Sequence, residues 1–164
     1  DGRIQLKEGQ INFLSAPTGS GKGCLAEYLC RQSDLPLLCV DPLRQLVRQT
    51  HDRLDKAGIN VIHYETEHPG DARDCDALAI CTPSVNLNKR VLEYFLNREE
   101  DTKINVLMDE THLLAKQLFD RKQLFPKFYS SLDGRVETFM LMSATPTANC
   151  QTLIERLQKD FYGS

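Results

Sequence analysis

The sequence INFLSAPTGSGKG, residues 11–23, joins an apolar run to a glycine-containing loop and then to a helix-like segment. The apolar run at 11–14 is typical of a buried strand, and Lys22 begins a segment with helical spacing of apolar residues. Gly19 and Gly21 allow the loop to turn its N–H groups inward, and the positive end of the following helix attracts anions. The stretch therefore predicts a phosphate-binding loop between a strand and a helix, with Lys22 as a point charge for the outer phosphates.

This loop resembles the P-loop of nucleotide-binding proteins, but it departs from that pattern at two positions. Ala16 replaces the first glycine, and Gly23 replaces the serine or threonine that follows the lysine. In P-loop proteins that hydroxyl binds Mg²⁺, so Gly23 predicts a loosely held metal and impaired hydrolysis. The alternative is a glycine-rich turn from strand to helix in which the lysine occurs by chance.

Length and composition favour one globular domain. The chain has 164 residues, of which 41% are hydrophobic and 26% are charged, and this is ordinary for a soluble protein with a core. Its net charge of −3 gives no overall attraction for nucleic acid, so such binding requires a local surface or a partner domain. No apolar run approaches the roughly 18 residues of a membrane span, and residues 1–10 are too polar for a signal peptide. We expect no membrane contact.

The cysteine pattern favours reduced thiols. There is no CxxC pair among Cys24, Cys30, Cys39, Cys75, Cys81 and Cys150. Several of these residues lie in apolar runs, where structural thiols are common. We therefore expect an intracellular protein, in the cytoplasm or the nucleus or nucleoid.

Strand-like apolar runs alternate with helix-like segments along the chain. Strands are expected at 11–14, 36–40, 60–64, 77–81, 104–108 and 139–142. Helices are expected at 22–31, from 43 to near Gly58, and at 84–96, 113–128 and 153–161. The polar stretch 65–76 is expected outside the core. This alternation predicts a three-layer, doubly wound α/β fold with a mainly parallel sheet, in which ligands bind at the carboxyl ends of the strands.

Two acidic residues follow the strand expected at 104–108. The carboxylates of Asp109 and Glu110 should emerge at the sheet edge beside the phosphate loop. Asp109 is suited to hold Mg²⁺, usually through water, and Glu110 to orient or deprotonate an attacking water. The alternative is a pair that caps a helix, because acids are favoured in a first helical turn.

Five segments resemble motifs of the first motor domain of superfamily 2 helicases, in the order which that family shows. They are APTGSGK at 16–22 (motif I), VDPLRQLVRQ at 40–49 (motif Ia), CTPS at 81–84 (motif Ib), DETH at 109–112 (motif II in its DExH form) and SATP at 143–146 (motif III). The resemblance implies a RecA-like P-loop NTPase domain. It also implies ATP and Mg²⁺ as cofactors and movement along DNA or RNA.

The resemblance also implies roles for individual residues. Lys22 would bind the β- and γ-phosphates, Asp109 would hold Mg²⁺, and Glu110 would position water. The nucleotide-binding group would comprise Thr18, Gly19, Ser20, Gly21, Lys22, Gly23 and Cys24. His112 would act with this group and link it to the nucleic-acid face, together with Ser143, Ala144 and Thr145.

Motifs Ia and Ib would contact the nucleic-acid backbone, with Arg44, Thr82 and Ser84 as the main candidates. Pro42, Gln49 and Pro83 complete this group. Such contacts are independent of base sequence and sensitive to salt. Each of these residues also has a simpler structural interpretation. In it, Arg44 and Arg48 would only form the solvated face of a helix, and Thr82 would cap a helix. His112 would lie in a first helical turn, and Ser143 and Thr145 would end a strand.

Superfamily 2 motors contain two RecA-like domains, whereas the resemblance here covers only the motifs of the first. We expect the second domain to be absent from these 164 residues and the isolated piece to hydrolyse ATP poorly. An adenine-reading glutamine is not recognisable around Gln5 or Gln10. Two other functions remain as alternatives. One is a degenerate nucleic-acid-binding module that has lost hydrolysis through Gly23. The other, a small P-loop kinase or GTPase, is disfavoured, because a lid, a substrate pocket and a base-reading NKxD motif are not recognisable and because DETH and SATP argue against both.

Overall fold

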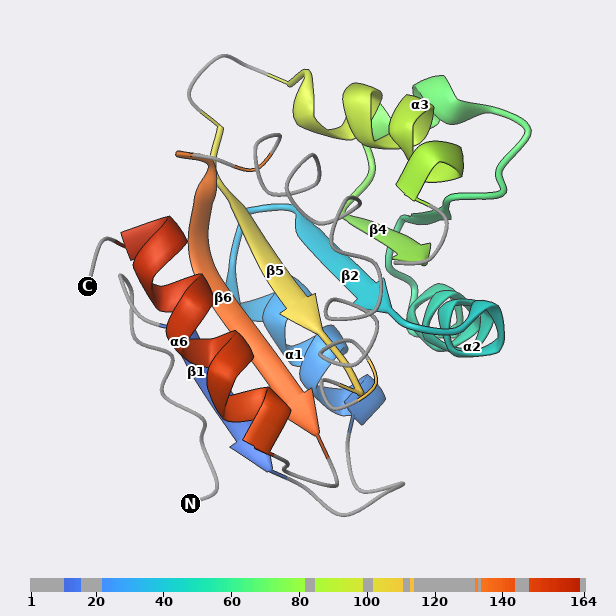
Figure 1. Cartoon of the computed structure of the whole chain (residues 1–164). Coiled ribbons are helices and arrows are strands. Elements are labelled where there is room, and N and C mark those ends of the chain that lie inside the picture. Colours follow the sequence, from blue (N-terminus) through green and yellow to red (C-terminus); the bar gives the residue numbers. More distant parts are fainter. Residues whose placement is uncertain are drawn as a thin grey trace.

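The computed structural model describes residues 11–15, 22–81, 85–98, 102–110, 113, 132, 134–143 and 148–162. Within these residues six strands form one sheet: β1 (Ile11–Ser15), β2 (Leu37–Asp41), β3 (Val61–His63), β4 (Ala77–Cys81), β5 (Ile104–Met108) and β6 (Val136–Ser143). Their spatial order is β1-β6-β5-β2-β4-β3, and every pair of neighbours is parallel. The predicted parallel α/β fold is confirmed (Figure 1).

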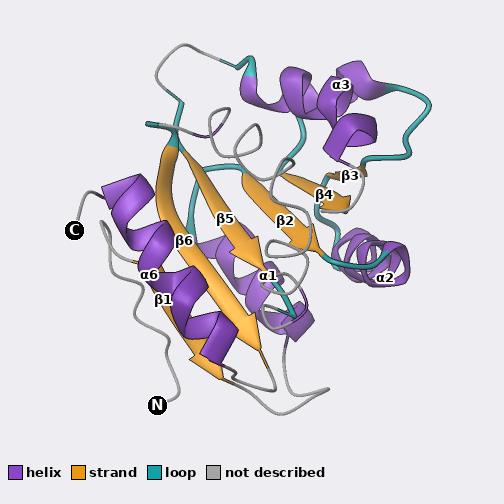
Figure 2. Ribbon diagram, in the orientation of Figure 1, coloured by secondary structure: helices purple, strands orange, loops and turns teal. Residues whose placement is uncertain are grey.

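The connections between the strands contain helices that cover both faces of the sheet. The described helices are α1 (Lys22–Gln32), α2 (Arg44–Lys56), η1 (Pro69–Arg73, a 3₁₀-helix), α3 (Val85–Leu96) and α6 (Ala148–Tyr162). Helix α6 lies in front of β1 and β6, whereas α1 lies behind the sheet (Figure 2). The three predicted layers are therefore present. The helix expected at 113–128 lies outside the described residues, apart from Leu113.

The centre of the sheet is fully enclosed. Every residue of β2, β4 and β5 is buried, which explains why these strands read as continuous apolar runs instead of alternating ones. The largest completely buried side chains include Phe95 of α3 and Phe139 of β6. Each such side chain contributes about 1.5–3 kcal/mol through burial and so stabilises the core between helices and sheet.

The expectation that residues 65–76 lie outside the core is wrong in part. Ala72 and Cys75 have no exposed surface, and η1 packs against α3. Arg98 follows α3 and donates hydrogen bonds to the carbonyl oxygens of Ala72, at 3.0 Å, and of Cys75. The charged residues of the segment face outward while two small residues turn inward, so no periodic apolar pattern was available to predict this burial.

Candidate functional site

The carboxyl ends of β1, β6 and β5 lie side by side at one edge of the sheet. Ser15 pairs with Ser143, and Leu141 pairs with Met108, so the three strands end at similar heights. Helix α1 begins with Lys22 at the same edge (Figure 1). Since β6 alone separates β1 from β5, their ends are about 10 Å apart. This confirms the predicted placement of the start of α1 and of Asp109 at a common edge.

The acidic pair continues directly from β5. The N–H of Asp109 donates to the carbonyl oxygen of Val40 at 3.1 Å, and this bond extends the pairing with β2 by one residue. The N–H of Glu110 donates to Oδ1 of Asp109 at 2.7 Å. Both acidic residues are partly exposed. Asp109 is therefore fixed by the sheet while its carboxylate remains within reach of a ligand.

Glu110 has an unusual backbone conformation. Its φ is +50°, in the left-handed region, and the described residues contain no other non-glycine residue with positive φ. Its carbonyl oxygen accepts a hydrogen bond from the N–H of Leu113 at 2.9 Å, so the turn is closed. Left-handed backbone costs about 1–2 kcal/mol at such a residue, and strain of this kind is concentrated at functional sites.

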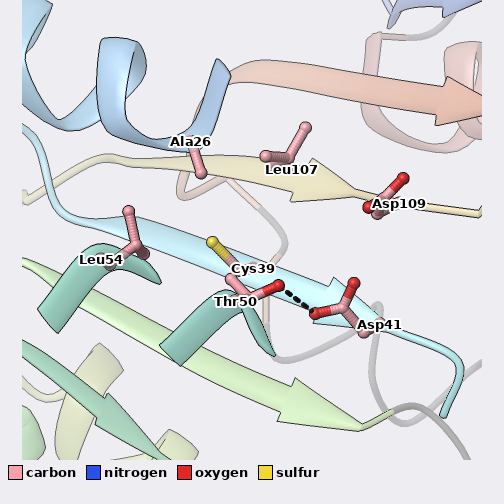
Figure 3. A pocket seen from close by; sticks show the side chains of 7 residues that line it. All are labelled: Ala26, Cys39, Asp41, Thr50, Leu54, Leu107 and Asp109. Atoms are coloured by element: carbon pink, nitrogen blue, oxygen red, sulfur yellow. Dashed lines mark hydrogen bonds between the residues drawn. The ribbon is translucent and has the colours of Figure 1, made fainter. Parts of the chain in front are cut away.

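A small cavity of about 30 Å³ lies beside Asp109 (Figure 3). Its lining consists of Ala26, Cys39, Asp41, Thr50, Leu54, Leu107 and Asp109. Asp41 is the last residue of β2 and is only 2% exposed. Oγ1 of Thr50, from α2, donates to Oδ2 of Asp41 at 3.0 Å. The cavity thus brings together two strand-end carboxylates and a helix hydroxyl.

Sequence analysis missed Asp41 and Thr50. Asp41 lies inside the run at 40–49 that resembles motif Ia but receives no role there, and nine residues separate it from Thr50 along the chain. The available signal was a carboxylate directly after four apolar strand residues, since burying such a group requires hydrogen-bond partners. The identity of its partner depends on how α2 packs on the sheet, which local patterns do not give.

Cys39 lies in the same cavity and is fully buried among these charges. Burial first, and then the charge of Asp41, raise the pKa of its thiol well above the ordinary value. The thiol is therefore neutral near pH 7. This protonation state does not suit a nucleophile or a metal ligand, both of which require the thiolate.

The residues predicted from motif Ia lie at the same edge of the sheet. Pro42 is buried, whereas Arg44 and Gln49 on α2 are exposed. Leu43, the N-cap residue of α2, is 49% exposed and makes no side-chain capping bond. Because β2 lies next to β5, the start of α2 is close to the acidic pair. The structure therefore brings Arg44 and Asp109 to neighbouring strand ends.

Ser143, predicted to belong to the coupling group, ends β6 and is 1% exposed. Its strand lies between those of the phosphate loop and the acidic pair. This position is consistent with both interpretations of Ser143: a residue that links the two sites, and a small residue that only ends a strand.

Several predicted site residues lie outside the part of the chain that the structure describes. They are Thr18, Gly19, Ser20, Gly21, Thr82, Pro83, Ser84, His112, Ala144 and Thr145. For Lys22, Gly23 and Cys24 the backbone is described as the first turn of α1, and their side chains are not. The roles predicted for these residues stay predictions.

The acidic edge has donor chemistry that fits Mg²⁺. Asp109 presents a partly exposed carboxylate, and Mg²⁺ prefers oxygen ligands. Among the described residues there is no group of three or more His, Cys, Asp and Glu side chains that could enclose a metal. A nucleotide-bound Mg²⁺ does not need one, because one or two carboxylates, phosphate oxygens and waters complete its octahedron.

Comparison with protein families identifies the class to which this fold and site belong. Residues 4–153 match the family described as DEAD/DEAH box helicase. The chain therefore belongs to the DEAD/DEAH box helicase family, and its parallel sheet is a RecA-like domain of superfamily 2. None of the curated proteins compared with the chain matches it.

Solved structures show the same fold at low sequence identity. A hypothetical ATP-dependent RNA helicase from Sulfolobus tokodaii is 20% identical, with a TM-score of 0.60 over 90% of this chain and 45% of that one. S. cerevisiae Dbp5, bound to RNA and ADP BeF3, is 16% identical, with a TM-score of 0.65 over 90% of this chain and 39% of that one. S. tokodaii Xpd4 is 16% identical, with a TM-score of 0.50 over 68% of this chain and 24% of that one. The chain spans less than half of the length of each of these proteins.

No helix in the described ranges combines the length and apolar character needed to span a membrane.

Proposed function

We propose that this domain binds ATP with Mg²⁺ at the carboxyl edge of its sheet and, completed by a second RecA-like domain, uses hydrolysis to move along nucleic acid. The observation that carries the proposal is the common position of Lys22 and Asp109. The first begins α1 and the second extends β5, at one edge of a parallel sheet with only β6 between them. Membership of the helicase family supports the same ligand.

The nucleotide roles follow from the chemistry of each group. Lys22 and the backbone N–H groups of residues 18–24 attract the phosphates, since a helix begins there and its dipole favours anions. Asp109 holds Mg²⁺, which when bound neutralises charge on the phosphate oxygens. Glu110 orients and deprotonates the attacking water, in the DExH form of the acidic motif. The left-handed backbone at Glu110 sets its direction relative to Asp109.

The nucleic-acid face extends from α2 toward the end of β4. Arg44 is exposed at the start of α2 and contributes a phosphate contact, with Pro42 and Gln49 beside it. Thr82, Pro83 and Ser84 extend this face, and His112, Ser143, Ala144 and Thr145 couple it to the nucleotide. The order of the strands supports a nucleotide side and a nucleic-acid side of the edge. Strands β1, β6 and β5 are neighbours on the nucleotide side, and β2 and β4 are neighbours on the nucleic-acid side.

The test is ATP turnover by the full-length parent protein with and without a single-stranded oligonucleotide, supplied once as DNA and once as RNA. The proposal predicts that one of the two stimulates turnover and that Lys22→Ala abolishes both basal and stimulated rates. Turnover that is unaffected by either oligonucleotide would contradict the motor function.

A second candidate is a nucleic-acid-binding module without efficient hydrolysis. The sequence feature that favours it is Gly23, which places no hydroxyl in the first turn of α1 where Mg²⁺ normally finds one. This module would bind the oligonucleotides with no measurable turnover. The same assay therefore separates the two functions.

We also propose that the protein works in a reducing, intracellular compartment. In the described ranges Cys30, Cys39 and Cys75 are thiols that form no disulfide. Burial raises the pKa of Cys30 to about 11 and that of Cys75 to about 11, so both stay protonated and slow to oxidise. Thiol titration of the unfolded protein from its native source tests this, and a native disulfide would contradict it.

A further inference from the structure

Asp41 and Asp109 occupy equivalent positions at the ends of neighbouring strands. Val40 of β2 pairs with Met108 of β5. Asp41 and Asp109 directly follow these two residues, so they lie side by side at the ends of the two strands. Both line the cavity of about 30 Å³, together with Thr50 (Figure 3). A water needs roughly 10–15 Å³, so the cavity of about 30 Å³ has room for one beside the two carboxylates. Polar lining on two sides makes that site suitable for water.

Packing of the sheet does not require a carboxylate at Asp41. The preceding residues of β2 are apolar and buried, and an apolar side chain would continue that pattern without a desolvation cost. Asp41 is instead 2% exposed and accepts a hydrogen bond from Oγ1 of Thr50. A buried carboxylate held in this way fixes the relative position of β2 and α2.

Thr50 connects this carboxylate to the helix that carries Arg44. Both residues lie in α2, six positions and about 9 Å apart along its axis. A helix of this length moves as a rigid body over such a distance, so a displacement of its first turn also displaces Thr50. The hydroxyl then acts on Asp41, and Asp41 faces the cavity that Asp109 shares.

We propose that Asp41 and Thr50 form a positioning pair that couples nucleic-acid contact at the start of α2 to Mg²⁺–nucleotide binding at Asp109. The proposal deepens the function given above and rests on it. Asp41 itself is a positioning residue and acts through Asp109. The alternative is a purely structural pair that holds α2 on the sheet, which would affect stability and leave the coupling unchanged.

The experiment measures binding of a fluorescent, non-hydrolysable ATP analogue by the full-length parent as a function of Mg²⁺ concentration. Each titration is run with and without the oligonucleotide that stimulates turnover. In the wild type, the oligonucleotide should lower the Mg²⁺ concentration at which binding of the analogue is half-maximal. The ratio of the half-maximal concentrations without and with oligonucleotide is the shift. Thr50→Val has nearly the same shape and lacks the hydroxyl, so it should reduce this shift about 3- to 10-fold.

Three further variants accompany Thr50→Val. Thr50→Ser restores the hydroxyl and should restore the shift. Thr152→Val removes an exposed hydroxyl from α6, where Oγ1 donates to the carbonyl oxygen of Ala148 at 3.2 Å, and should leave the shift as in the wild type. Asp41→Asn keeps the shape and one oxygen for Thr50 but replaces a carboxylate oxygen by an NH₂ group. It should also weaken the shift, and it serves if Thr50→Val does not fold.

The outcomes separate the inference from the function on which it rests. A wild-type shift that persists in Thr50→Val and Asp41→Asn overturns the inference alone, including the case in which both variants are less stable. A wild-type protein that does not bind the analogue overturns the proposed function and the inference together. Loss of the shift in Thr50→Val with recovery in Thr50→Ser supports the coupling.

Discussion

At the scale of single residues, the candidate site combines Asp109, whose backbone is held by the sheet, with Glu110, whose backbone is strained. Asp109 continues the pairing of β5 with β2, whereas Glu110 turns into the left-handed region with φ +50°. A helix-capping pair does not require left-handed backbone at its second residue, so this conformation favours the catalytic interpretation of Glu110 over the capping one.

The strain at Glu110 gives a prediction in which stability and activity change in opposite directions. Glu110→Gly should raise the free energy of unfolding by up to about 1 kcal/mol, because glycine adopts positive φ without steric cost. It should also lower ATP turnover about 100-fold or more, since the group that activates water is lost. Urea unfolding and an ATPase assay check the two effects. Glu110→Gln is the control: it should lose turnover without gaining stability.

Gly23 gives a second prediction at this scale. Gly23→Thr restores a hydroxyl to the first turn of α1 and should raise Mg²⁺-dependent ATP turnover of the full-length parent. Gly23→Ala serves as the control, because it improves helix propensity by about 1 kcal/mol without supplying a ligand. Equal or lower turnover in the threonine variant, or an equal gain in the alanine variant, would contradict this account of the loop.

At the scale of elements, α2 connects the two halves of the site. It follows β2, whose carboxyl end lies beside that of β5, and it presents Arg44 and Gln49 to solvent. Toward the sheet it supplies the hydroxyl that binds Asp41. One helix therefore has a surface suited to a phosphate backbone and an inner face that contacts the acidic edge.

Removal of the exposed cation at the start of α2 should weaken nucleic-acid binding. Arg44→Ala should lower affinity about equally for different base sequences and reduce the slope of log K against log salt by about 1, since one phosphate contact is lost. Fluorescence anisotropy at several salt concentrations measures both. Arg53→Ala removes the same charge from the last turn of the same helix and should change the slope much less. Equal effects of the two variants would indicate a diffuse charge effect instead of a contact.

The contact between α2 and β3 predicts a pH dependence of stability. The rings of His51 and His63 lie edge to face at 4.8 Å, and Asp52, Glu65 and Arg48 surround them. Burial first, and then His51, lower the pKa of His63 below 6.5. The folded state thus binds this proton less readily than the unfolded state, so the stabilisation is complete above pH 6.5 and is lost as pH falls through the folded pKa.

Unfolding by urea at pH 7.5 and pH 5.5 should therefore show a loss of stability at the lower pH that is smaller in His63→Gln. His68→Gln, at an exposed position before η1, is the matched control and should keep the wild-type pH dependence. An unchanged pH dependence in His63→Gln would show that other groups cause it.

At the scale of the whole molecule, the fold could be predicted because its strands are buried on both faces. Enclosed parallel strands such as β2, β4 and β5 must be apolar throughout, and they stand out between polar helices. Once the sheet is parallel, strand ends share an edge, so the common position of Lys22 and Asp109 followed from order along the chain.

What sequence analysis missed depends on tertiary packing. The hydrogen bond from Thr50 to Asp41 joins a helix to a strand end, and no local periodicity marks it. Ala72 and Cys75 are buried where η1 packs against α3, and Arg98 from the end of α3 donates hydrogen bonds to their carbonyl oxygens. Strand β6 begins at Val136, three positions before the predicted strand, because its pairing with β5 extends to Ile104. In each case a partner distant along the chain determines the outcome.

The central claim is that one triphosphate is bound between the start of α1 and the acidic end of β5. The most direct measurement is the affinity of the full-length parent for a fluorescent ATP analogue, with and without Mg²⁺, in Lys22→Ala, Asp109→Asn and the control Lys159→Ala on α6. We predict at least about tenfold weaker binding for Lys22→Ala in both conditions, a similar loss for Asp109→Asn only with Mg²⁺, and no change for Lys159→Ala. Wild-type affinity in Lys22→Ala and Asp109→Asn would contradict the claim.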